Sequence, residues 1–121
     1  MRLFALRGAN SVERDEPEAI LAATTELMHE IVSRNGLEPA MTVSCIFTAT
    51  ADLSSEFPAV AARAIGFDRV QLLCAQEIPV PGAMARVIRV LIHYHAPEGH
   101  EPTHVYLGET RALRADLHAA Q

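Results

Sequence analysis

The stretch "MARVIRVLIHYH" at residues 84–95 predicts the longest β-strand of the chain and decides the fold. Alternate side chains of a strand point to opposite faces of its sheet. One face of this strand would carry Ile88, Val90, Ile92 and Tyr94. The other face would carry Val87, Arg89, Leu91 and His93. Neither set is clearly polar, so we expect the strand to be buried on both sides.

The remaining sequence supplies further strands and two helices around this segment. Apolar runs predict strands at residues 2–9, 42–49, 69–74 and 103–107. The first strand is expected to end at Gly8. In the second, Val43, Cys45 and Phe47 are expected on one face.

The clearest helix follows the first strand. Asp15 and Glu16 mark its start, Pro17 lies in its first turn and Gly36 ends it. A shorter, alanine-rich helix is expected at residues 57–65, closed by Gly66.

These elements predict an α/β (α+β) domain with a single β-sheet of about five strands, one long helix and one short helix. Two helices cannot cover both faces of five strands, so one face of the sheet must meet water or another subunit. The apolar pattern of residues 84–95 favours another subunit, and we therefore expect an oligomer.

Length and composition narrow the class of protein. A chain of 121 residues forms one domain, residues 1–121, in which we expect residues 112–121 to be a flexible C-terminal tail. The net charge of −5 argues against a non-specific nucleic-acid binder. The N-terminal apolar run "LFAL" is too short for a signal peptide or a membrane span, so we expect a cytoplasmic protein.

All ten basic residues are arginine, and lysine is absent from the sequence. This excludes a Schiff-base lysine and a lysine-containing phosphate loop. Arginine is well shaped to hold a carboxylate by two oxygens at once. The composition suits a ligand that carries carboxylates, but coding bias or heat adaptation is an equally good explanation of it.

Other kinds of catalytic site find little support. The sequence has no Gly-rich phosphate loop and no serine nucleophile elbow. Cys74 has no histidine nearby in the sequence, and Cys45 resembles a small hydrophobic residue of a strand. His93 and His95 lie two residues apart, but no carboxylate or cysteine stands at a spacing that would complete a metal site. We expect neither a metal nor another cofactor.

Arg89 is the most informative of the arginines. A guanidinium is costly to bury and keeps its charge at ordinary pH, yet Arg89 stands among apolar residues. It therefore requires an anionic partner, which could be Glu77 or a ligand.

Several segments together resemble the monofunctional bacterial AroH-type chorismate mutases. They are "LRGANSVERDEPEAI" (6–20), "FTATADLSSEFPA" (47–59), "CAQEIPVPG" (74–82), "RVIRVL" (86–91), "HVYL" (104–107) and "LRADL" (113–117). The resemblance implies a homotrimer of mixed sheets packed into a barrel-like core, with active sites between subunits. It also implies the conversion of chorismate to prephenate, which leads to phenylalanine and tyrosine.

The resemblance further implies roles for individual residues. Arg7 would bind a substrate carboxylate, and Tyr106 would lie at a carboxylate as well. Arg89 would meet the ether oxygen, and Cys74 and Glu77 would meet the ring hydroxyl. The catalytic residues would be Arg89, Glu77 and Arg7. The remaining substrate-binding positions are Leu72 and Leu73, Phe57, Ala59 and Arg63 from a neighbouring subunit, and Leu113 and Arg114 from the mobile tail.

Two positions depart from the pattern of that family. Val60 stands where some members have a lysine at the edge of the pocket, and "LRADL" lacks the proline that usually precedes the aspartate. We expect effects on substrate capture and on closure of the tail, and none on the residues assigned to the chemistry.

Two alternatives keep the trimeric architecture. One is a RidA-like deaminase of enamines or imines, which also holds an arginine at a cleft between subunits. The other is a non-catalytic module that binds a carboxylate metabolite.

Overall fold

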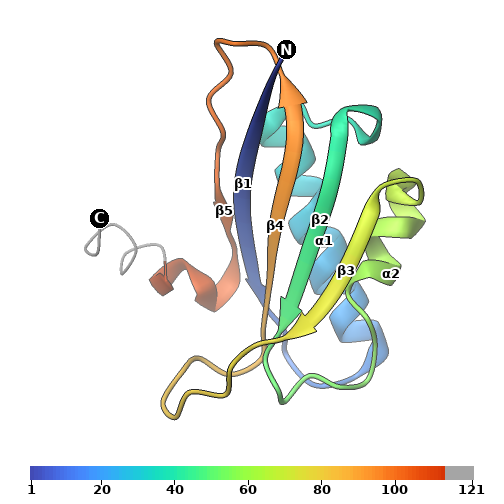
Figure 1. The fold of residues 1–121 in the computed structure, drawn as a ribbon. Helices are drawn as coiled ribbons and strands as arrows, with labels where there is room; N and C mark the ends of the chain where they lie inside the picture. Colours follow the sequence, from blue (N-terminus) through green and yellow to red (C-terminus); the bar gives the residue numbers. More distant parts are fainter. Residues whose placement is uncertain (114–121) are drawn as a thin grey trace.

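A five-stranded mixed sheet forms one layer of the computed structural model, which describes residues 1–113 (Figure 1). The strands are β1 (Arg2–Ser11), β2 (Thr42–Ala49), β3 (Gln71–Gln76), β4 (Val87–Ala96) and β5 (Val105–Tyr106). They lie in the order β3-β2-β4-β1-β5, so the strand predicted to decide the fold is central. It runs antiparallel to β1 and β2, whereas the β1–β5 and β2–β3 pairs are parallel.

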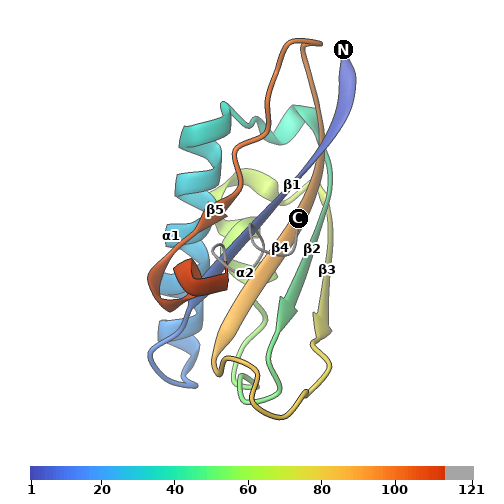
Figure 2. The ribbon, with the colours of Figure 1, turned by 90° about the vertical axis from the view of Figure 1, so that its left-hand side faces the viewer.

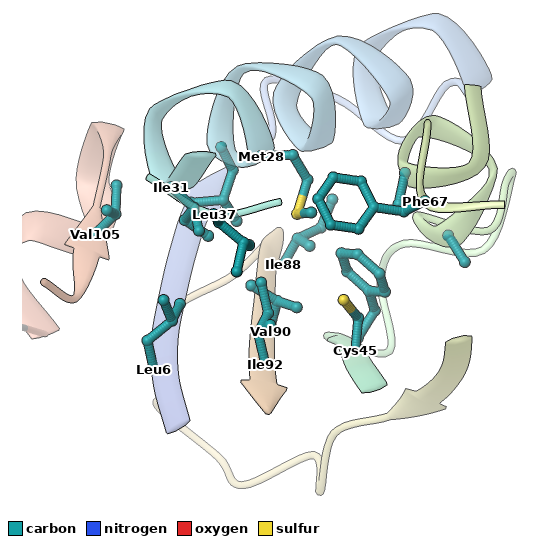
Figure 3. Close-up of a cluster of buried hydrophobic side chains, with 14 of the residues drawn as sticks. Leu6, Met28, Ile31, Leu37, Cys45, Phe67, Ile88, Val90, Ile92 and Val105 are labelled. Atoms are coloured by element: carbon teal, nitrogen blue, oxygen red, sulfur yellow. The ribbon is translucent and has the colours of Figure 1, made fainter. Parts of the chain in front are cut away.

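The helices α1 (Pro17–Asn35) and α2 (Ala59–Ala62) cover one face of this sheet (Figure 2). Short turns η1 (Pro39–Met41), η2 (Arg63–Phe67) and η3 (Gly108–Thr110) connect or end the larger elements. The hydrophobic core lies between the two layers (Figure 3). Its contributors from β4 are Ile88, Val90, Ile92, Tyr94 and Ala96, and the alternation of the sequence predicted the first four.

Among residues 1–113, no helix or further strand covers the other face of the sheet. Arg89, with 43% of its side chain exposed, and His95 lie on it. Leu3 and Leu73 are also exposed there, at 53% and 60%. Residues 1–113 of a single chain therefore do not bury β4 on both sides, and its burial by another subunit stays a prediction. We refer to this face of the sheet as the open face.

Several element boundaries differ from the predicted ones. β1 continues past Gly8 to Ser11, because its antiparallel pairing with β4 extends to Val87. β3 begins two residues later than predicted, after a turn in which the Val70 N–H donates to the Phe67 carbonyl. β4 begins at Val87, since Arg86 has a positive φ of 51° and interrupts the extended backbone. β5 is limited to two residues.

Val43 departs from its predicted face. A register shift between Thr42 and Ser44 interrupts the β2–β4 ladder, and Val43 is 45% exposed. Cys45 and Phe47 are buried, as predicted.

The ends of the helices also differ in part from prediction. Pro17 occupies the first turn of α1, and Gly36 ends it in the left-handed conformation with its N–H on the Val32 carbonyl. Neither Asp15 nor Glu16 caps the helix through its side chain: Glu16 is at the cap without such a bond, and Asp15 binds the loop at Ser54 and Ser55. α2 is shorter than predicted because it passes into the wider π-helical turn η2, where Gly66 has φ 109°.

Within residues 1–113, no helix combines the length and the apolar character needed to span a membrane.

Candidate active site

A cavity of about 280 Å³ on the open face brings together three of the predicted site residues, Arg7, Arg89 and Tyr106. Its other lining residues are Gly8, Ile46, Thr48, Val90 and Leu91. The register explains the meeting. Arg89 lies opposite Thr48 on β2 and Ala9 on β1, and Ala9 lies opposite Tyr106 on β5. Residues directly opposite each other share a face, so one row of side chains crosses the sheet.

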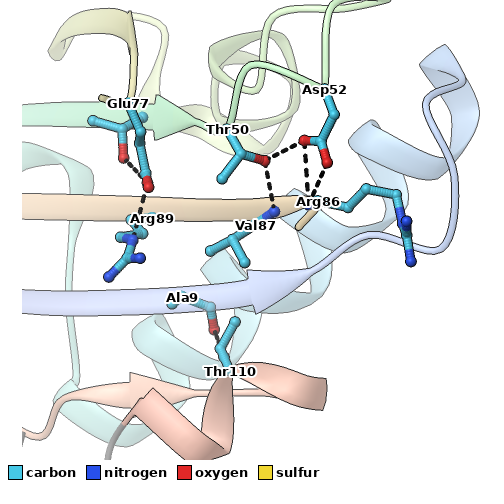
Figure 4. Close-up of polar contacts among 9 residues, drawn as sticks. Ala9, Thr50, Asp52, Glu77, Arg86, Val87, Arg89 and Thr110 are labelled. Carbon is cyan, nitrogen blue, oxygen red and sulfur yellow. Dashed lines mark hydrogen bonds and ion pairs between the residues drawn. The ribbon is translucent and has the colours of Figure 1, made fainter. Parts of the chain in front are cut away.

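Glu77 is the partner of Arg89 within the chain (Figure 4). The Arg89 Nε donates to Glu77 Oε2 over 2.9 Å. The Thr48 Oγ1 donates to the same oxygen over 2.6 Å. Among residues 1–113, the guanidinium of Arg89 makes no other hydrogen bond, so its two Nη atoms are available to a ligand.

The position of Glu77 follows from the parallel pairing of β2 and β3. Thr48 lies opposite Ala75, and the N–H of Glu77 donates to the Ala49 carbonyl over 2.9 Å. This bond extends the ladder past the end of β3, so the side chain of Glu77 falls on the same face as Ala75. The Glu77 side chain is only 17% exposed. From this face its carboxylate reaches Arg89 on the next strand but one.

Arg7 and Tyr106 are held by backbone contacts of the opposite edge of the sheet. The Arg7 N–H donates to Nδ1 of His104 over 2.9 Å, and the Leu107 N–H donates to the Ala9 carbonyl over 2.9 Å. Thr110 in η3 also donates its hydroxyl to Ala9, which secures the chain beyond Tyr106 (Figure 4). Arg7 thus stands within β1 rather than at its end, because β1 is longer than predicted.

The other predicted site residues lie apart from this cavity. Phe57, which is 66% exposed, and Cys74 line a second cavity of about 240 Å³ beside the loop that precedes α2. Arg63 is exposed in η2, on the helix side of the sheet. One chain alone therefore does not bring Phe57 and Arg63 into the cavity that holds Arg89.

The remaining predicted site residues that the structure describes do not line the cavity that holds Arg89. Ala59 is 4% exposed within the core, and Leu72 and Cys74 pack partly against that core from the helix side of β3. Leu73 points to the open face. Leu113 is half-buried at the end of the described chain, and Arg114, like the rest of the predicted tail from 114 onward, lies outside the described residues.

His93, which was considered as a possible metal ligand, and His100 each contact a hydroxyl group. Nδ1 of His93 lies 3.1 Å from the Ser44 hydroxyl, and Nε2 of His100 lies 2.6 Å from the Tyr94 hydroxyl. In the part of the chain that the structure describes, His, Cys, Asp and Glu form no group of three able to hold a metal ion.

Burial sets the protonation of two groups in the core. It raises the pKa of the Cys45 thiol to about 12, and it also raises the pKa of the Tyr94 hydroxyl. At neutral pH Cys45 is therefore a protonated, poorly reactive thiol.

Thr48 was not among the predicted site residues, although it lines the cavity and bonds to Glu77. The alternation of strand 42–49 contained a signal, since it places Thr48 on the face opposite Cys45 and Phe47. What the sequence did not contain was the register that sets Thr48 beside Arg89.

Comparisons with known proteins identify the family of this chain. Residues 3–117 match the family described as chorismate mutase type I. The chain is 49% identical over 118 residues to chorismate mutase AroH of Thermus thermophilus, covering 96% of this chain and 97% of that protein. It is 38% identical to chorismate mutase AroH of Bacillus subtilis (strain 168) over 120 residues, covering 97% and 94% of the two chains.

A solved structure is also similar. The fold superposes on a chorismate mutase from Clostridium thermocellum with a TM-score of 0.86 and 39% identity, covering 90% of this chain and 98% of that one. The match in sequence and the match in fold each span most of the chain. This chain belongs to the chorismate mutase type I family.

Proposed function

We propose that this protein is a chorismate mutase that converts chorismate into prephenate in a site shared between two subunits of a homotrimer. The observation that carries the proposal is the cavity in which Arg7, Arg89 and Tyr106 meet, with Arg89 anchored by Glu77 at one nitrogen only. This cavity presents cationic and hydroxyl groups without a nucleophile, which suits a substrate that needs to be held and stabilised.

The reaction places limited demands on the protein. Chorismate is a dianion, and its rearrangement breaks a carbon–oxygen bond and forms a carbon–carbon bond in one step. No covalent intermediate or proton transfer is required. The protein accelerates the step by holding the compact, chair-like conformer and by placing positive charge where the ether oxygen becomes negative.

Arg89 is suited to the electrostatic part of this task. Its charge is permanent, and its position at the centre of a five-stranded sheet makes it rigid. Because Glu77 occupies Nε, the Nη atoms can meet the ether oxygen and a carboxylate together. Glu77 keeps its second oxygen, Oε1, for the ring hydroxyl of the substrate.

Arg7 and Tyr106 complete the part of the site that one chain supplies. Both line the cavity from the β1–β5 edge of the sheet, where they would bind the carboxylates of the dianion. We assign Arg89, Glu77 and Arg7 to catalysis and Tyr106 to binding.

The second part of the site would come from a neighbouring subunit. The open face exposes Leu3 and Leu73, and the cavity on it is lined from one side only. Phe57 is exposed on a loop away from that cavity, and Arg63 is exposed in the helix layer. A closed ring of three subunits places one patch of each chain against a different patch of the next. Phe57 and Arg63 can thereby close the cavity of the neighbour.

Incubation with chorismate tests the proposed activity. The ultraviolet absorbance of chorismate should fall while prephenate appears, and Arg89→Ala prepared in the same way should show that the turnover does not come from a host enzyme. Tight binding without conversion would instead indicate a binding module, and a protein indifferent to chorismate would contradict the proposal.

A further inference from the structure

We infer that Thr48 is a positioning residue that holds Glu77 in the single-contact arrangement with Arg89, an inference that rests on the proposed function. Thr48 lies directly opposite Arg89 on β2 and lines the same cavity. It acts on the reaction through the carboxylate of Glu77.

The contacts of the Glu77 carboxylate are unequal. Oε2 accepts one bond from the Thr48 hydroxyl at 2.6 Å and one from the Arg89 Nε at 2.9 Å. Within residues 1–113, Oε1 accepts no hydrogen bond from another side chain. The carboxylate is thus held at one oxygen, and the other oxygen remains available.

This arrangement is not the one that the two charged groups favour by themselves. Arginine and carboxylate commonly form a bidentate pair with two parallel N–H···O bonds. In such a pair Glu77 would occupy an Nη atom of Arg89 with its second oxygen. The bond from Thr48 fixes Oε2 from the β2 side and so keeps the carboxylate in the observed orientation.

Glu77 needs this support because its backbone is joined to the sheet by one bond, from its N–H to the Ala49 carbonyl. It lies just beyond the end of β3, at the start of a loop in which Ile78 and Val80 are 83% and 58% exposed. Thr48, in contrast, stands within a strand paired on both sides. Its hydroxyl therefore holds the carboxylate in a fixed position relative to the sheet.

The expected consequence is specific to catalysis. Without the hydroxyl, Glu77 can turn toward the Nη edge of Arg89 and occupy the Nη atom that would meet the ether oxygen. Its second oxygen would then no longer accept from the ring hydroxyl. The charge at the ether oxygen acts in the transition state, so the loss should fall mainly on kcat.

Thr48→Val tests the inference, because valine keeps the shape of the side chain and removes the hydroxyl. We expect kcat to fall about 10- to 100-fold, the range for loss of a hydrogen bond to a charged group. Thr48→Ser restores the donor and should stay within about threefold of the unaltered protein. Ser44→Ala, on the same strand and the same face, is the matched control and should leave kcat unchanged. Thr48→Ala serves in place of valine if that variant does not fold, as shown by circular dichroism.

A double-mutant cycle separates a positioning role from a merely structural one. If Thr48 acts through Glu77, Thr48→Val should cause no further loss in a Glu77→Ala background. Additive losses, or a Thr48→Val protein with unaltered kcat, would overturn the inference and leave the proposed function intact. Absence of turnover by the unaltered protein would contradict the proposed function itself, and with it the role of Thr48.

Discussion

Arg89 Nε, within β4, and Glu77 Oε2, at the start of the loop that joins β3 to β4, form an ion pair of 2.9 Å. The arginine side chain is 43% exposed and the glutamate 17%, so solvent screens the pair and its contribution to stability is small. The pair serves to orient two groups toward the cavity on the open face.

Arg89→Ala should therefore fold almost normally and lose activity. We expect kcat to fall by about 10²–10³, the usual effect of removing one preorganised donor. Arg89→Lys should recover little, because an ammonium cannot make the forked contact. Steady-state kinetics with chorismate, combined with a melting curve, checks both statements. A near-normal kcat with only a raised KM would show that Arg89 contributes to binding alone.

The rate should depend little on pH. The proposed mechanism contains no general acid or base, and arginine does not titrate between about pH 6 and 9. We therefore expect kcat to be nearly constant over this range at saturating chorismate. A steep, bell-shaped profile would indicate proton transfer and favour a deaminase-like reaction instead.

Mixed trimers test whether two chains share each site. Phe57→Asp/Arg63→Ala and Arg89→Ala each remove one side of the site and should be nearly inactive alone. When they are unfolded and refolded together in equal amounts, about three-quarters of the trimers should be mixed, each with one intact site. Activity should then recover to about one-quarter of the unaltered level.

The control for this experiment is mixing without unfolding, which should restore little because subunits exchange slowly. Light scattering establishes that trimers have formed. Refolded mixed trimers with no more activity than the separate variants would place the complete site within a single chain.

Gly8 lies where β1 packs against α1, and we expect Gly8→Ala to destabilise the protein. An added Cβ would lie 2.7 Å from Ile31 Cδ1, 3.2 Å from Leu27 Cδ1 and 3.3 Å from Val90 Cγ1. Overpacking of this kind lowers the free energy of unfolding by about 1–3 kcal/mol. Denaturant titration measures the change. Gly99→Ala, where the Cβ has open space, is the control and should alter stability by less than about 0.5 kcal/mol.

Asp15 should make stability depend on pH in the acid range. Hydrogen bonds from the Ser55 side chain and the Ser54 backbone lower the pKa of its carboxyl below the ordinary value of 3.8. A lowered folded-state pKa stabilises the fold above the ordinary value, and this contribution is lost as pH falls through the folded pKa. Asp15→Ala should therefore lower Tm at pH 7, and the difference from the unaltered protein should shrink below pH 3.8.

The exposed Asp68 provides the comparison for Asp15. Asp68→Ala should not reproduce the difference in Tm at pH 7 or its loss in acid. A difference for Asp15→Ala that stays constant down to pH 2 would show that the carboxylate bonds to Ser54 and Ser55 do not stabilise the fold.

The sequence by itself determined the order and type of the main elements and most of their buried faces. Periodicity identified β2 at its observed bounds and the core face of β4, because alternation and helical spacing are local properties of the chain. Gly36 ended α1 for a local reason as well, since it adopts the left-handed conformation there. The requirement that Arg89 have an anionic partner was also visible, and Glu77 was one of the two partners considered.

Only the tertiary structure decided which side chains meet. Thr48, Arg89, Ala9 and Tyr106 form one row because of strand order and register, which join residues far apart in the chain. Long-range contacts also place Asp15 beside Ser54. A register shift between β2 and β4 leaves Val43 exposed. A polar side chain bonds to whichever donor or acceptor the packed chain brings within reach, so the contacts of Thr48 and Asp15 exist only after the strands and loops have assembled.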